Sequence, residues 1–241
     1  MGRHFITLAT IAVGLAMLAG SSHAATPPVP RTSTPVAALP PLRTTDFNLI
    51  GDNIIVPLPA GYCPASGRFE GIAQLTAAAD KENLTTASLY LCDDIASDTA
   101  PTRYALVKTP RKLLLVKASR SELLAEMGAI PPSELAALMN SENLGKEASK
   151  SASEVLGAKT EIGVNIQPVA ADEYGYYITG TGQGSAGTQT FQVCFAGVLT
   201  TIKGHVIAYY FYAPGQTLGD IAAVLALTKA EVRRLIKANG D

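Results

Sequence analysis

The sequence is poor in the residues that most metal-binding and many catalytic sites require. It has no tryptophan, three cysteines and three histidines in 241 residues. His4 and His23 lie in an N-terminal segment that we expect to be removed, which leaves His205 as the one histidine of the mature chain. A single histidine cannot form a His₃, His-Glu-x-x-His or Cys₂His₂ zinc site. We therefore predict neither a metal nor a cofactor.

Charge is scarce and balanced. Charged residues make up 16% of the chain, against about 25% in typical soluble domains. The 19 basic and 20 acidic residues give a net charge of −1. Without a basic excess to neutralise phosphates, we do not expect nucleic acid as a partner.

The first 24 residues follow the plan of a secretory signal peptide. A basic start at Arg3 precedes an uncharged apolar run over 5–19, and Ser22 and Ala24 are the small residues of a cleavage site. The run is shorter than the ~20 residues that span a bilayer. Ser21 stands where a lipoprotein carries its lipidated cysteine. We predict cleavage after Ala24, no stable membrane span afterwards, and a periplasmic or secreted product.

Residues 25–45 are predicted to be a disordered linker, and residues 46–241 a single domain. The linker holds six of the 15 prolines and shows no amphipathic period. Such a segment cannot bury enough apolar surface to offset the entropy of ordering its backbone.

Strands and helices are predicted in runs, which favours an α+β fold: an antiparallel sheet packed with helices. Alternating β-type residues predict strands, and capping residues predict where helices begin. The expected strands are 47–58 (with a turn at 51–53), 86–92, 103–107, 161–169, 173–181, 190–202 and 205–213. The expected helices are 69–83, one after Ser119, one from Ser133 to about residue 156, and one or two after Thr217 and Thr228.

The hairpin 190–213 is apolar on both of its faces, with a two-residue turn at Lys203-Gly204. A hairpin of this kind belongs in the middle of a sheet that is covered on both sides, so the sequence favours a three-layer α/β/α arrangement. One face is predicted to carry Phe195, Leu199, Ala208 and Tyr210, and the other Val198, Ile207, Tyr209 and Phe211.

This order of elements resembles the PsbP/Mog1-like fold group: a β-hairpin, a helix, strands, a long helix, antiparallel hairpins and a terminal helix. The resemblance extends over about 190 residues and rests on element order, with no diagnostic motif. Members of that group serve mostly as binding or assembly factors. The resemblance therefore implies a binding role rather than catalysis.

Three cysteines in an exported chain allow three pairings. We favour Cys63–Cys92, because both residues are predicted near the ends of elements, where a bridge forms with little strain. Cys194 lies in the middle of a predicted strand and is expected to be a buried, unreactive thiol. The alternative is that all three cysteines are reduced and buried.

No complete catalytic constellation is evident in the sequence. With the turn at Lys203-Gly204, the numbers of two paired residues add up to 407, so Cys194 opposes Ala213. Cys194 therefore lies too far from His205 for the two to form a catalytic dyad. We expect His205 to be solvated beside the turn. The run 182–187 matches G-x-G-x-x-G, but a strand-like segment follows it where a dinucleotide site needs a helix. We interpret this run as a loop between two strands.

Several tyrosines gather on the C-terminal strands. Tyr176, Tyr209 and Tyr210 could line a ligand pocket. The alternative is that they are core or half-buried positions of the sheet.

The sequence thus favours an exported, non-enzymatic module that binds a small apolar ligand or a partner protein. The rival hypothesis is an extracytoplasmic hydrolase built from carboxylate, serine or tyrosine groups, with His205 as a possible member. A serine and an aspartate within hydrogen-bond reach of His205 would favour the hydrolase.

Overall fold

The computed structural model describes residues 43–139, 146, 149–150, 153, 159–186 and 189–241. The predicted signal peptide, nearly all of the predicted linker and most of the second half of the helix expected over 133–156 lie outside these residues. The first strand begins at Thr44, inside the range assigned to the linker.

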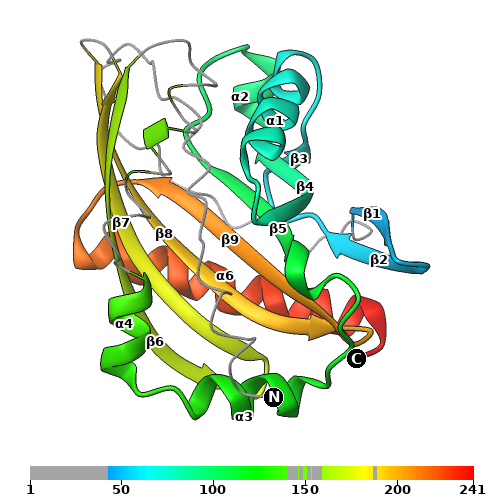
Figure 1. The fold of residues 1–241 in the computed structure, drawn as a ribbon. Helices are drawn as coiled ribbons and strands as arrows, with labels where there is room; N and C mark the ends of the chain where they lie inside the picture. Colours follow the sequence, from blue (N-terminus) through cyan, green and yellow to red (C-terminus); the bar gives the residue numbers. More distant parts are fainter. Residues whose placement is uncertain (1–42, 140–145, 147–148, 151–152, 154–158, 187–188) are drawn as a thin grey trace, which may run out of the picture.

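The described residues form a seven-stranded antiparallel sheet in the order β3-β4-β5-β9-β8-β7-β6, and a separate hairpin, β1-β2 (Figure 1). Each neighbouring pair in the sheet is antiparallel, as the sequence predicts for an α+β fold. The strands are β1 Thr44–Leu49, β2 Asp52–Pro57, β3 Tyr62–Pro64, β4 Asn83–Leu91, β5 Tyr104–Pro110, β6 Thr160–Asp172, β7 Gly175–Ala186, β8 Gln189–Ile202 and β9 His205–Pro214.

The hairpin β8-β9 lies at the centre of the sheet in the predicted register. Ile202 pairs with His205, and Cys194 pairs with Ala213. The two predicted faces are also found: Phe195, Ala208 and Tyr210 belong to one core cluster. Val198, Ile207, Tyr209 and Phe211 belong to the other.

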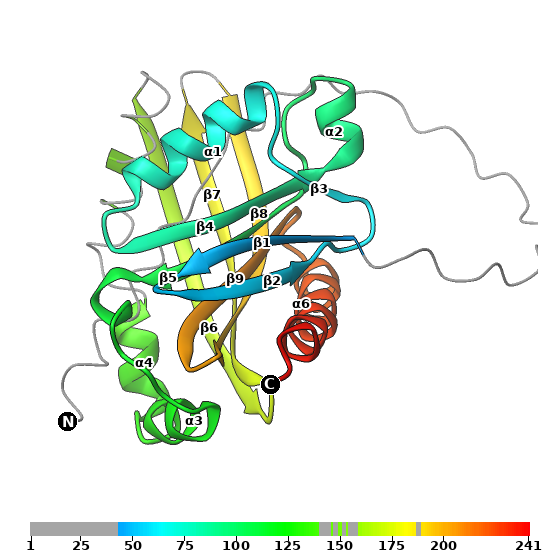
Figure 2. The ribbon, with the colours of Figure 1, turned by 90° about the vertical axis from the view of Figure 1, so that its right-hand side faces the viewer.

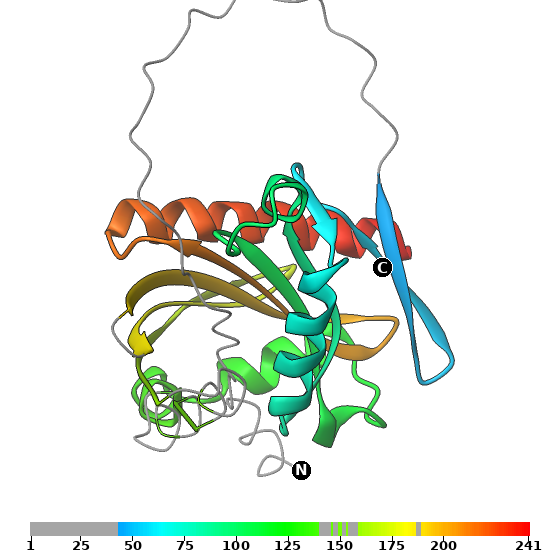
Figure 3. The ribbon, with the colours of Figure 1, turned by 90° about the horizontal axis from the view of Figure 1, so that it is seen from above.

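Helices cover both faces of this sheet. On one face lie α6 (Leu218–Asn239) and the hairpin β1-β2, which are neighbours in Figure 2. On the other face lie α1 (Arg68–Ala79), α3 (Arg120–Gly128) and α4 (Pro132–Met139). Figure 3 shows α6 and the α3-α4 pair on opposite sides of the strands. The short helix α2 (Cys92–Ala96) follows β4. The three-layer α/β/α arrangement is confirmed.

Local signals fixed the beginnings of two helices. Ser119 and Thr217 form capping boxes with Glu122 and Asp220, as expected from their spacing. Of the one or two closing helices expected after Thr217 and Thr228, the structure has one. Thr228 lies inside α6, where its hydroxyl donates a hydrogen bond to the backbone oxygen of Val224 one turn earlier.

The glycine-rich run 182–187 was wrongly interpreted as a loop: β7 continues through it to Ala186. Gly184 is needed there, because a Cβ atom at this position would come within 2.3 Å of the Phe191 ring. Gly184 therefore leaves room for an aromatic side chain of the next strand.

Candidate functional site

An open cavity of about 1020 Å³ is lined by the beginning of β6, the end of β7 and the beginning of β8. At this end of the sheet these strands extend past the C-terminal end of β9 (Figure 1). The apolar part of the cavity comes from Ile162 and Phe191, and its polar part from hydroxyl, amide and lysine side chains. The described lining residues are Lys146, Ser149, Lys150, Ser153, Lys159, Thr160, Glu161, Ile162, Gly163, Gln183, Gly184, Ser185, Thr190, Phe191 and Gln192.

Two serines that line the cavity form hydrogen bonds with the backbone of the edge strand β6. The Oγ of Ser149 accepts a hydrogen bond of 2.9 Å from the backbone N–H of Ile162. The Oγ of Ser153 accepts one of the same length from Thr160. Both hydroxyls thus satisfy backbone groups that an edge strand leaves unpaired, and neither is positioned as an activated nucleophile.

The described lining residues of the cavity carry more positive than negative charge. Glu161 is the one carboxylate among the described lining residues, and Lys159 Nζ lies 2.8 Å from its Oε1. The hydrogen bond from Lys159 lowers the pKa of Glu161, and the same bond raises the pKa of Lys159. Lys146 and Lys150 add two further cations. A carboxylate held in its ionised form is poorly suited to act as a general acid near neutral pH.

This combination of described residues can bind a ligand. Lysine ammonium groups attract an anion, the Phe191 ring and Ile162 offer an apolar contact, and the Gln183 and Gln192 amides can both donate and accept hydrogen bonds. The arrangement fits a small molecule with an anionic group and an apolar part.

The three tyrosines predicted to line a pocket lie on two faces of the sheet. Tyr209 is fully buried on the α6 face, whereas Tyr176 and Tyr210 belong to the opposite face. The ring of Tyr210 packs over Gly197, where a Cβ atom would come within 2.4 Å of it. None of the three lines the cavity described above. Ligand binding by these residues stays a prediction.

His205 is not solvated, contrary to expectation: its side chain is 1% exposed. Its Nε2 lies 2.9 Å from Asp52 Oδ2 and 2.7 Å from Lys117 Nζ. A protonated Lys117 needs Nε2 as an acceptor and Asp52 needs it as a donor, so Nε2 serves one of them at a time. His205 is the first residue of β9. It is buried because the hairpin β1-β2 folds over the beginning of this strand and brings Asp52 to it. No local signal in the sequence indicates this contact.

The surroundings of His205 do not form a hydrolase triad within the described residues. Among the described residues its Nε2 contacts both an aspartate and a lysine, and its Nδ1 is buried without a hydrogen-bond partner. A triad histidine needs its base-orienting carboxylate and its nucleophile on different nitrogens. Moreover, β8 runs from the cavity near Thr190 to Ile202 beside His205, roughly 40 Å at ~3.3 Å per residue.

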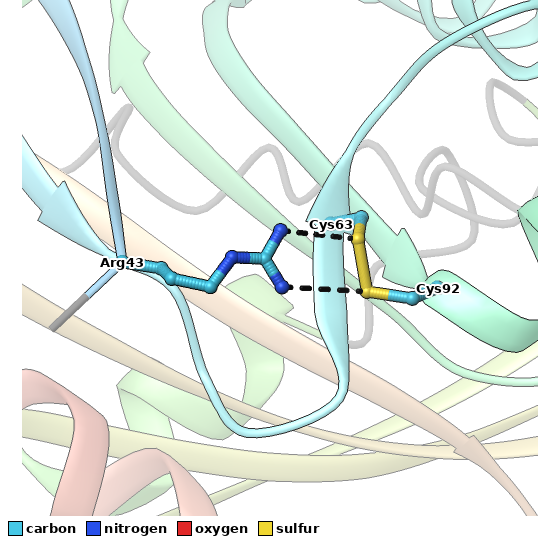
Figure 4. The surroundings of a disulfide bond; sticks show 3 residues. All are labelled: Arg43, Cys63 and Cys92. Atoms are coloured by element: carbon cyan, nitrogen blue, oxygen red, sulfur yellow. Dashed lines mark hydrogen bonds between the residues drawn. A yellow bond between two sulfur atoms is a disulfide. The ribbon is translucent and has the colours of Figure 1, made fainter. Parts of the chain in front are cut away.

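The predicted disulfide between Cys63 and Cys92 is confirmed. It joins the edge strand β3 to the first residue of α2, with the two Cα atoms 5.1 Å apart. The guanidinium of Arg43 lies against both sulfur atoms (Figure 4). Cys194 is a free, buried cysteine, and burial raises the pKa of its thiol, as expected of an unreactive group.

The described part of the chain contains no group of three or more histidine, cysteine, aspartate and glutamate side chains that could hold a metal ion. None of the helices described is both long and apolar enough to cross a membrane.

The cavity itself was missed by sequence reasoning. Its described lining comes from three strands and from Lys146, Ser149, Lys150 and Ser153, and the glycine run 182–187 was the one local signal that pointed to this place. A glycine at every second position of a strand indicates that something packs closely on that face. At Gly184 this is Phe191, one of the lining residues.

Comparison with known proteins identifies a weak likeness of fold. No protein family and no curated protein matches the sequence. Cyanobacterial PsbP (CyanoP) from Synechocystis sp. PCC 6803 is similar over 82% of this chain and 96% of its own, with 9% identity and a TM-score of 0.39. The Ran-binding protein Mog1p of Saccharomyces cerevisiae is similar over 81% and 96%, with 10% identity and a TM-score of 0.32. The chain therefore resembles, weakly, the PsbP/Mog1-like fold.

Proposed function

We propose that this protein is an exported, non-enzymatic binding module, and that its ligand is a small molecule with an anionic group and an apolar part. The cavity at the ends of β6, β7 and β8 carries the proposal. It combines Lys146, Lys150 and Lys159 with the apolar surface of Phe191 and Ile162. The sequence led us to expect a small apolar ligand or a partner protein, and the lysines favour a small ligand that also carries an anionic group.

The described groups of the cavity support binding rather than turnover. The hydroxyls of Ser149 and Ser153 are engaged by backbone groups of β6. Glu161 is paired with Lys159. His205 lies at the far end of β8 and contacts Asp52 and Lys117. These arrangements favour the binding module over the hydrolase.

The proposal is tested first by mass spectrometry of the protein exported by a bacterial host. The denatured mass reports whether the chain is cleaved after Ala24, and the native mass reports any ligand that co-purifies. We expect cleavage and an added mass that is lost in the denatured sample. An intact N-terminus would contradict export, and a native protein free of ligand leaves the direct titration below to decide binding.

The titration uses decanoate as the anionic, partly apolar probe and decanol as its uncharged counterpart. We expect decanoate to bind more tightly than decanol, and Lys150→Glu to weaken decanoate binding by up to about fivefold, since one surface-type charge contact contributes up to ~1 kcal/mol. The matched control is Lys237→Glu, the same change at an exposed position of α6. Equal binding of the two probes, or equal loss in both variants, would refute the cavity as the site.

A further inference from the structure

We propose that Cys63–Cys92 is a site of thiol–disulfide exchange with a dithiol, in which Arg43 holds Cys63 as the departing thiolate. The proposal rests on the position of one cation relative to two sulfur atoms, and it is independent of the cavity and its ligand.

Arg43 reaches both sulfurs of the bridge. Its Nη2 lies 3.4 Å from the Sγ of Cys63, and its Nη1 lies 4.0 Å from the Sγ of Cys92 (Figure 4). Among the described residues its guanidinium has no carboxylate partner, and the side chain is exposed. A disulfide gains little from a full positive charge beside it, whereas a thiolate at the same place is strongly favoured.

The bridge is also accessible, unlike the third cysteine. Cys63 and Cys92 are half-buried, while Cys194 is fully buried. Cys63 lies in β3, a three-residue strand at the edge of the sheet. Opening the bridge therefore leaves the central strands β8 and β9 in place. The charged side chains nearest to Cys92 in the sequence are those of Asp93 and Asp94. Asp93 is exposed, and the Oδ2 of Asp94 accepts hydrogen bonds from Thr102.

The geometry assigns a direction to the exchange. Arg43 lies closer to the Sγ of Cys63, so this sulfur is the better leaving group, and the attacking thiolate approaches the Sγ of Cys92. A bond forms between the attacking sulfur and Cys92 Sγ, the Sγ–Sγ bond breaks, and Cys63 departs with the electron pair. The second thiol of the dithiol, as its thiolate, then attacks its own mixed-disulfide sulfur and releases Cys92. The dithiol is oxidised to a disulfide, and two protein thiols are formed.

The equilibrium is measured with dithiothreitol as the dithiol, by alkylating free thiols and counting them by mass. Opposite charges within ~4–6 Å favour the charged form by tenfold or more. We therefore expect Arg43→Ala to lower the equilibrium constant for reduction of the disulfide about tenfold. This change corresponds to a reduction potential about 30 mV more negative. Arg43→Lys should lie between, because one ammonium cannot reach both sulfurs. Arg111→Ala, at another exposed arginine, is the matched control.

Two further measurements on the unaltered protein keep the proposal falsifiable should the Arg43 variants fail to fold. High salt should screen the exposed guanidinium and make the bridge harder to reduce. In a reaction with glutathione that is stopped by acid, the adduct should be found on Cys92 and the free thiol on Cys63. An adduct mainly on Cys63 would overturn the assigned direction. Equal potentials for the protein, Arg43→Ala and Arg111→Ala would overturn the role of Arg43.

Discussion

At the scale of single residues, glycines decide where the large aromatic side chains of the sheet can lie. A Cβ atom at Gly197 would come within 2.4 Å of the Tyr210 ring, and one at Gly180 within 2.5 Å of the Phe195 ring. These contacts pair a residue without a side chain with a ring on the neighbouring strand. The aromatic rings can therefore lie flat on the sheet beneath the helices.

We expect Gly197→Ala to lower the free energy of unfolding by about 1–3 kcal/mol, the usual cost of overpacking a core. Gly71→Ala is the matched control. Gly71 lies inside α1, where a Cβ atom would meet nothing within 4 Å, so it should be neutral or stabilise by about 0.5–1 kcal/mol. Urea unfolding of both variants measures the difference. Equal effects would show that the close contact at Gly197 relaxes without cost.

A second residue-scale prediction concerns pH. The hydrogen bond from Lys117, and then that from His205, lowers the pKa of Asp52 in the folded protein. A lowered folded-state pKa means that Asp52 stabilises the fold at pH values above its ordinary pKa of 3.8. That contribution is lost as the pH falls through the folded-state value.

The free energy of unfolding of Asp52→Asn should therefore be lower than that of the unaltered protein near pH 6. The difference should shrink as the pH falls below about 4. Urea titrations across this range measure it, with Asp46→Asn as the control at an exposed carboxylate of the same hairpin. A difference that stays constant with pH would contradict the role of the Asp52 carboxylate.

At the scale of elements, α6 depends on both its cap and its apolar face. Thr217 and Asp220 satisfy each other's backbone N–H groups, and Gly240 ends the helix in a left-handed conformation. The face toward the sheet buries Val224, Val232, Leu235 and Ile236. The cap sets where the helix begins, and the apolar face sets how it lies on β8 and β9.

Removing the cap should destabilise the protein without moving the helix. We expect Thr217→Ala to cost about 1 kcal/mol, within the 0.5–2 kcal/mol typical of N-cap losses. Thr217→Ser keeps a hydroxyl that can accept from the N–H of Asp220 and should stay close to the unaltered protein. Thermal unfolding compares the two, and an equal loss in both would mean that the threonine methyl, not the hydroxyl, matters.

At the scale of the whole molecule, the sheet separates three groups of residues with different chemistry. The lysine-lined cavity lies at one end of β8, and the His205–Asp52–Lys117 cluster lies at the other. The disulfide lies at the β3 edge of the sheet. Since these groups share no residue, a variant in one of them should leave the other two unchanged, which makes each proposal separately testable.

The sequence by itself determined the features that depend on neighbours along the chain. The capping boxes at Ser119 and Thr217, the turn at Lys203-Gly204 and the two-sided hairpin around it were all predicted, because propensity and side-chain period act over a few residues. The pairing of Cys63 with Cys92 followed from their places near element ends.

Only the tertiary structure decided which distant residues meet. Asp52 and His205 are 153 residues apart, and their contact follows from β1-β2 folding over the beginning of β9. The cavity was assembled from three strands and from Lys146, Ser149, Lys150 and Ser153. Local periodicity gives the face on which a side chain lies. What covers that face depends on how the layers pack, and that is set by contacts between segments far apart in the chain.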